Sequence, residues 1–112
     1  MPKKTKRTRT SGNAEALALL GLAQRAGAVA KGTEATRRAL QRAEARLVVL
    51  AKDGSEAQRE KVLPLARARG VPWEILGTRQ ELGDAVGSGL LSALAVTRGD
   101  LVLEIRDRLG RE

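Results

Sequence analysis

The chain has no cysteine and no histidine, and its 112 residues include a single aromatic side chain, Trp73. Without cysteine it cannot be a disulfide-stapled scaffold. The usual nucleophilic thiol, the commonest general base and the commonest metal ligands are missing with these residues. One ring cannot form the row of aromatic side chains on which single-stranded nucleic acids stack. We therefore expect no catalytic site, no metal site and no base-stacking platform.

Long apolar stretches and nucleotide-binding motifs are also missing. Purely apolar runs such as Leu47–Ala51 are far too short to span a bilayer, and the basic N-terminus lacks the apolar segment of a secretory signal. No Walker pattern occurs, no Gly-x-Gly-x-x-Gly follows an expected strand, and Gly83, Gly87 and Gly89 are expected after a helix rather than before one. These features predict a cytoplasmic protein with no cofactor and no membrane partner.

The positive charge of the chain, +8 overall, is concentrated in two segments. Residues 1–9 hold five Lys or Arg and no acid, and residues 25–52 hold seven against two acids. The rest of the chain is slightly acidic. Scattered surface Lys and Arg can simply keep a small protein soluble, but segregated charge is typical of a protein that binds a polyanion.

Helical periodicity, capping residues and glycine stops predict helices and strands in alternation. Residues 1–12 have almost no apolar side chains and are expected to form a disordered basic arm, followed by a single domain over residues 13–112. Helices are expected at 13–26, 33–45, from 55 through Pro64, at 78–86 and from 100 onward, and strands at 29–30, 47–51, 71–76 and 91–97. This alternation predicts an α/β sandwich around a small four-stranded sheet.

Several local features carry more detailed expectations. Thr33 is expected to cap the second helix, with Thr36, Leu40 and Ala43 on its inward side. Pro64 predicts a kink or two short helical pieces, and Pro72 predicts that its strand lies at an edge of the sheet. Ser55 with Gln58, and Thr78 with Glu81, have the spacing of capping boxes. Asp100 is expected to cap the last helix.

The segment "KGTEATRRAL", residues 31–40, allows two interpretations. In the first, Thr33 caps a helix, Glu34 complements its positive end and the arginines are solvated. In the second, the helix start presents unpaired N–H groups to a phosphate or a base edge, and Gly32 permits close approach because it has no side chain. The second interpretation adds sequence-independent contacts from four cations: Lys31, Arg37, Arg38 and Lys52.

Four segments in unbroken order resemble the kink-turn RNA-binding superfamily of ribosomal proteins, and within it the bacterial YlxQ/YbxF-like branch. They are "LLGLAQRAGAVAKGTEATRRAL", "ARLVVLAKDGSE", "VLPLARARGVPWEILGTRQELGDAVG" and "SALAVT". The resemblance covers residues 15–97. It implies a three-layer α/β/α sandwich with a mixed four-stranded sheet, and binding to a kinked RNA internal loop rich in G·A pairs.

The resemblance also implies which residues contact RNA. The start of the second helix contributes Gly32, Thr33, Glu34 and Arg38, and the end of the strand at 47–51 contributes Lys52 and Asp53. The loop after the Leu-Gly block, the Leu-Gly-x-Ala-x-Gly sequence at Leu82 to Gly87, contributes Ser88, Gly89, Leu90 and Leu91. Leu90 and Leu91 would cover an unstacked base. The arm at Lys3–Arg9 would add phosphate contacts without specificity. The expected protein is a monomer bound to ribosomal or other structured RNA.

The chain departs from the superfamily at one place. Archaeal and eukaryotic members carry an Asn-Glu pair and then a Lys, where this chain has Glu34, Ala35 and Arg38. Arg38 keeps the cation, whereas the amide and carboxylate that read guanine edges are not both in register. The alternative interpretation is a protein–protein adaptor on the same fold, whose basic face docks an acidic partner.

Overall fold

The computed structural model describes the backbone of residues 2–109 and the side chains of residues 13–109. Helices and strands alternate along this part of the chain, as expected. In order they are α1 (Pro2–Arg25), β1 (Val29–Lys31), α2 (Thr33–Gln41), β2 (Leu47–Leu50), α3 (Glu56–Ala68), β3 (Trp73–Ile75), α4 (Arg79–Val86), β4 (Ala93–Val96) and α5 (Gly99–Leu109).

The four strands form one mixed sheet in the order β1-β4-β2-β3. Strands β2 and β3 are parallel, whereas β4 is antiparallel to both of its neighbours, β1 and β2. The central strands β2 and β4 are apolar and buried throughout. The strand that follows Pro72 lies at an edge, which confirms that expectation.

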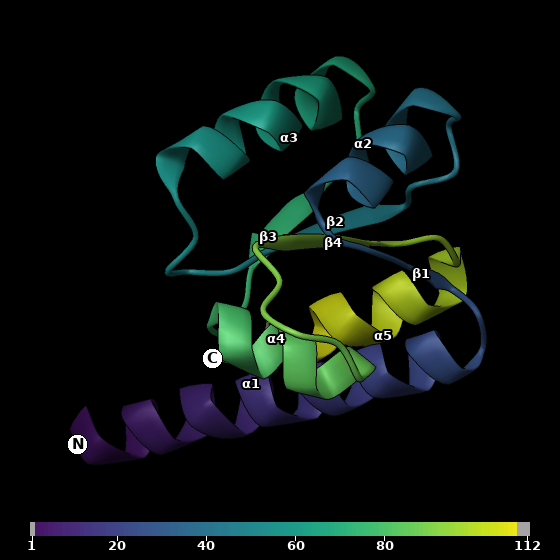
Figure 1. Cartoon of the computed structure of the whole chain (residues 1–112). Coiled ribbons are helices and arrows are strands. Elements are labelled where there is room, and N and C mark those ends of the chain that lie inside the picture. Colours follow the sequence, from purple (N-terminus) through teal and green to yellow (C-terminus); the bar gives the residue numbers. More distant parts are fainter. Residues whose placement is uncertain (1, 110–112) are drawn as a thin grey trace.

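Helices cover both faces of the sheet, which confirms the three-layer sandwich (Figure 1). Side chains of a strand point alternately to its two faces. Thus Leu47 and Val49 pack in a core with α1, α4 and α5, and Val48 and Leu50 pack in a second core with α2 and α3. Among the described residues, no helix has the length and apolar character needed to cross a membrane.

The first helix is longer than expected. It begins at Pro2 instead of Asn13, so the backbone is helical over most of the segment expected to be a disordered basic arm. Met1 and the side chains of residues 2–12 lie outside what the structure describes. Lys and Arg have favourable helix propensity, and extending an existing helix avoids the cost of nucleation.

The second helix is shorter than expected, because it ends in a Schellman motif. The N–H of Glu44 donates to the carbonyl oxygen of Ala39 at 2.9 Å, and that of Ala43 donates to Leu40 at 3.2 Å. Ala43 has a φ of 61° and is exposed, so its expected inward position is wrong. Thr36 and Leu40 are buried as expected.

The third and fifth helices also differ in detail. Helix α3 is one continuous helix through Pro64, not two pieces. Pro64 is exposed, so water can reach the carbonyl group that the ring leaves without its helical donor. Helix α5 begins at Gly99, which places Asp100 inside the first turn instead of at the cap. The capping box is confirmed: the N–H of Glu81 donates to the Thr78 hydroxyl oxygen, and the N–H of Thr78 donates to the Glu81 carboxylate.

Candidate nucleic-acid interface

The turn from β1 into α2 depends on the backbone of Gly32. This residue has φ 97° and ψ 164°, a combination that essentially only glycine adopts. Its N–H donates to the carbonyl oxygen of Ala93 at 3.0 Å, and its own carbonyl accepts from the Thr36 hydroxyl at 2.7 Å. Gly32 is the N-cap and offers no side-chain cap. The expectation that Thr33 caps the helix is therefore wrong, and the first-turn N–H groups of α2 receive no bond from a cap side chain.

The end of β2 lies at the same end of the sheet as the start of α2, with β4 between them. The N–H of Ala51 donates to the carbonyl oxygen of Ser92 at 3.0 Å, beside the bond from Gly32 to Ala93. The N–H of Lys52 donates to Gly77 at 2.8 Å. Residues 92 and 93 thus join the helix start to the strand end, although β1 and β2 are not neighbours.

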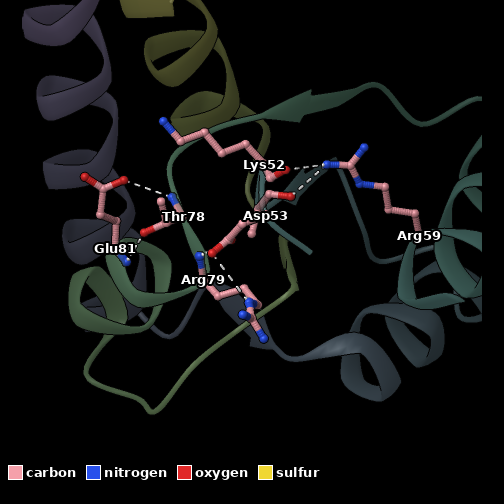
Figure 2. A network of polar contacts seen from close by, with 7 residues as sticks. Lys52, Asp53, Arg59, Thr78, Arg79 and Glu81 are labelled. Carbon is pink, nitrogen blue, oxygen red and sulfur yellow. Dashed lines mark hydrogen bonds and ion pairs between the residues drawn. The ribbon is translucent and has the colours of Figure 1, made fainter. Parts of the chain in front are cut away.

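Asp53 is engaged by the start of α4 (Figure 2). Its Oδ1 accepts a hydrogen bond from the backbone N–H of Arg79 at 2.8 Å, and its Oδ2 lies 3.6 Å from Arg79 Nε. The hydrogen bond from this N–H, with the nearby guanidinium, holds the pKa of Asp53 below its ordinary value. The carboxylate that was expected to contact RNA therefore already has partners within the protein.

Arg59 of α3 holds the same turn from the other side (Figure 2). One of its terminal nitrogens donates to the carbonyl oxygens of Ala51 at 3.0 Å and Lys52 at 3.1 Å. Its Nε is buried and has no hydrogen-bond partner among the described residues. This guanidinium fixes the backbone from which the Lys52 side chain extends.

The loop from Gly87 to Leu91 packs against α4 and reaches the start of α2. The N–H of Ser88 donates to Gly83 at 2.8 Å, and that of Leu91 donates to Arg79 at 3.2 Å. Leu91 is only 7% exposed, with its Cδ2 4.0 Å from the place of a Cβ on Gly32. Leu90 is 60% exposed. Of the two leucines expected to cover a base, only Leu90 has a free side chain.

The expected cations are not equivalent. Lys31, Arg38 and Lys52 are exposed, and their side chains have no hydrogen bond or ion pair within the described part of the chain. Arg37 instead donates from a terminal nitrogen to the carbonyl oxygen of Lys61 at 2.6 Å, and its Nε lies 4.0 Å from Oε1 of Glu34. Arg37 therefore joins α2 to α3. The described residues include no group of three or more metal-ligating side chains.

Sequence reasoning missed three residues that shape this surface: Arg59, Arg79 and Gly83. A Cβ on Gly83 would overlap the Gly89 carbonyl oxygen and lie 3.0 Å from that of Ser88, so the loop can pack on α4 only because residue 83 is glycine. The Leu-Gly block carried a signal for that position. Nothing in the sequence singles out Arg59 or Arg79 from the other arginines.

In sequence, residues 14–101 match the profile of the ribosomal protein L7Ae/L30e/S12e/Gadd45 family. The chain belongs to this family. Large ribosomal subunit protein eL8 of Halobacterium salinarum is 38% identical to it over 95 residues, which cover 82% of this chain and 79% of that protein. The eL8 protein of Methanobrevibacter smithii is 38% identical over 84 residues, covering 72% and 68%.

Solved structures share the fold of this L7Ae-family chain. A protein of unknown function from Bacillus halodurans C superposes with a TM-score of 0.80 at 28% identity, over 86% of this chain and 97% of that one. The 15.5kD RNA binding protein of Giardia lamblia superposes with a TM-score of 0.69 at 25% identity, over 84% and 83%. The expected family and fold are thereby confirmed.

Proposed function

We propose that this chain is a non-enzymatic, cytoplasmic RNA-binding protein that recognises kink-turn-like RNA and is associated with the ribosome or with translation. One observation carries the proposal: the uncapped start of α2 at Gly32 lies against Leu91 of the loop 88–91. The first-turn N–H groups of α2, which receive no bond from a cap side chain, thus lie beside a loop whose Leu90 side chain is exposed. The Giardia lamblia RNA-binding protein and the eL8 proteins support the same function.

Each part of the surface has a separate role in the proposed complex. The first-turn N–H groups of α2 would donate to a phosphate or a base edge, since a helix start favours an anion. Gly32 lets the nucleic acid approach the backbone, and Leu90 would cover an unstacked base. Lys31, Arg38 and Lys52 would neutralise phosphates, as exposed cations without protein partners can do.

Asp53 and Arg37 take a different role from the one expected. Both side chains bond to other parts of the protein, Asp53 to the start of α4 and Arg37 to α3. We assign them to positioning the surface instead of touching RNA. Thr33 and Glu34, in the first turn of α2, and Ser88 and Gly89, in the loop, remain at the proposed contact.

The test compares a kink-turn RNA with a straight duplex of equal length and base composition in a gel-shift titration. The proposal predicts a clear preference for the kinked RNA, and it predicts that Arg38→Glu cripples binding without changing the circular dichroism spectrum. Equal, weak binding to both RNAs that disappears in salt would contradict it. That outcome would favour the alternative, an adaptor whose basic face docks an acidic protein.

A further inference from the structure

Beside the start of α2, a second basic surface runs along the open edge of the sheet. A groove of about 490 Å³ lies between α2 and the edge strand β1, and Arg38, Arg42 and Arg46 line it together with Glu44. Alanine side chains of α2 and β1 line it as well. We call it the arginine groove.

The three arginines differ from most other arginines of the fold. Within the described residues, the guanidinium groups of Arg38, Arg42 and Arg46 have no hydrogen bond or ion pair. Elsewhere, guanidinium groups bond to backbone carbonyls or carboxylates: Arg37, Arg59, Arg69, Arg79, Arg98, Arg106 and Arg108. Arg38, in the last turn of α2, and Arg42, the C-cap residue of that helix, are also four residues apart, a spacing at which like charges repel. Three arginines against Glu44 leave these groove side chains with a net charge of +2.

The arginine groove connects the proposed RNA site to the opposite end of the sheet. Arg38 belongs to both surfaces. Arg46 lies just before β2, and its backbone N–H donates to the carbonyl oxygen of Val96, the last residue of β4, at 2.8 Å. Lys52 lies beyond the opposite end of β2. Arg46 and Lys52 are six residues apart and flank β2, a separation of up to roughly 20 Å at about 3.3 Å per residue, so they can contact different phosphates of one RNA.

We propose that Arg42 and Arg46 bind the phosphate backbone of an RNA stem that extends from the kinked loop along the β1 edge. This inference rests on the proposed function, since the kinked loop sets where the stem begins. Phosphates suit the groove because planar guanidinium groups pair with them in a bidentate geometry and need no base sequence. The stem would also neutralise the repelling Arg38–Arg42 pair.

The test uses two kink-turn RNAs, one with minimal stems and one with each stem lengthened by a full helical turn. Binding of wild type, Arg42→Gln and Arg46→Gln is titrated against salt. Each variant should lower the salt slope of log K on the long RNA by about 0.9, which corresponds to about a five-fold loss of affinity at 0.15 M salt. On the minimal RNA the variants should match wild type.

Arg67→Gln is the matched control, because Arg67 is exposed on α3 outside the groove. Wild-type slope and affinity for both groove variants on the long RNA would overturn the inference while leaving the kink preference of the wild type intact. Loss of that preference in the wild type would instead contradict the proposed function. Polyglutamate is the test for an acidic protein partner. If Arg42→Gln abolishes polyglutamate binding but leaves the salt slope of log K for the long RNA unchanged, the groove binds an acidic protein segment and the inference is overturned.

Discussion

The carboxylate of Asp53 accepts a hydrogen bond from the backbone N–H of Arg79, 26 residues later in the chain, at 2.8 Å. The carbonyl of Arg79 in turn accepts from the N–H of Leu91 at 3.2 Å. The end of β2, the start of α4 and the loop 88–91 are thereby linked through one residue. A change at Asp53 can reach the loop without any contact between Asp53 and RNA.

Replacing Asp53 by alanine should weaken binding to kinked RNA, although it removes a negative charge from a basic surface. The reason is that the Arg79 N–H loses its acceptor, so the Arg79 carbonyl that accepts from Leu91 is held less firmly in place. Affinity is measured by gel-shift or fluorescence anisotropy on the kink-turn RNA. Asp100→Ala is the control, because Asp100 pairs with Arg98 in an exposed ion pair. Unchanged or tighter binding by Asp53→Ala would mean that Asp53 only repels phosphate.

The stability that Asp53 contributes should depend on pH. Its pKa in the folded protein is lowered from an ordinary value of 3.8, mainly by the hydrogen bond from the Arg79 N–H. A lowered carboxyl pKa means that the stabilisation is fully present above 3.8 and is lost as the pH falls through the folded-state pKa. Urea unfolding should therefore show a difference in the free energy of unfolding between wild type and Asp53→Asn, and this difference should become smaller in acid. The difference for Ser55→Ala, a cap that does not titrate, should be constant; a pH-independent difference for Asp53→Asn would contradict the linkage.

Arg59→Met should destabilise the fold and weaken RNA binding together. The guanidinium donates to the carbonyl oxygens of Ala51 and Lys52, and a hydrogen bond from a charged group contributes about 1.5–3 kcal/mol. Urea denaturation should show a loss of about that size. Arg67→Met, on an exposed position of the same helix, should change stability by less than about 0.5 kcal/mol. Equal losses of unfolding free energy in the two variants would show that the bonds to Ala51 and Lys52 are not the cause.

Gly83→Ala should displace the loop 88–91. The added methyl group would overlap the Gly89 carbonyl oxygen and approach that of Ser88 to 3.0 Å, and backbone atoms cannot move aside as a flexible side chain can. Overpacking of this kind costs about 1–3 kcal/mol, more than the gain of up to about 1 kcal/mol from replacing a helical glycine by alanine. We therefore expect a lower melting temperature and weaker RNA binding.

The control for this variant is Gly99→Ala, since a Cβ on Gly99 meets nothing within 4 Å. It should leave stability unchanged or raise it slightly. If Gly83→Ala is as stable as wild type and binds RNA equally well, the contact between α4 and the loop does not set the surface.

The layers of this fold were predictable because each depends on a local pattern. The apolar run at residues 47–51 predicted a strand, and Thr78 with Glu81 predicted the start of α4; both are confirmed. The end of α2 was not predictable, because its Schellman motif places Ala43 where glycine is usual. The continuity of α3 depends on Pro64 facing solvent, which only packing decides.

The candidate surface was predictable in outline but not in its roles. Sequence order and resemblance identified the segments, and the sheet order brings them to one end. Which side chains remain free depends on contacts between distant residues. Asp53 accepts a hydrogen bond from Arg79, Arg37 donates one to Lys61, and Leu91 is buried beside Gly32. None of these partners is marked by spacing in the chain.

Recognition of kinked RNA by its shape is tested by the ratio of the protein's affinities for kinked and straight RNA across a salt titration. Phosphate contacts weaken for both RNAs as salt rises, whereas the proposed contacts of the Gly32 helix start and Leu90 depend on RNA shape. We expect the preference for kinked RNA to persist or grow from about 50 to about 300 mM salt, a range over which phosphate contacts lose much of their strength. A ratio that falls to one as salt rises would contradict it and leave only a basic surface.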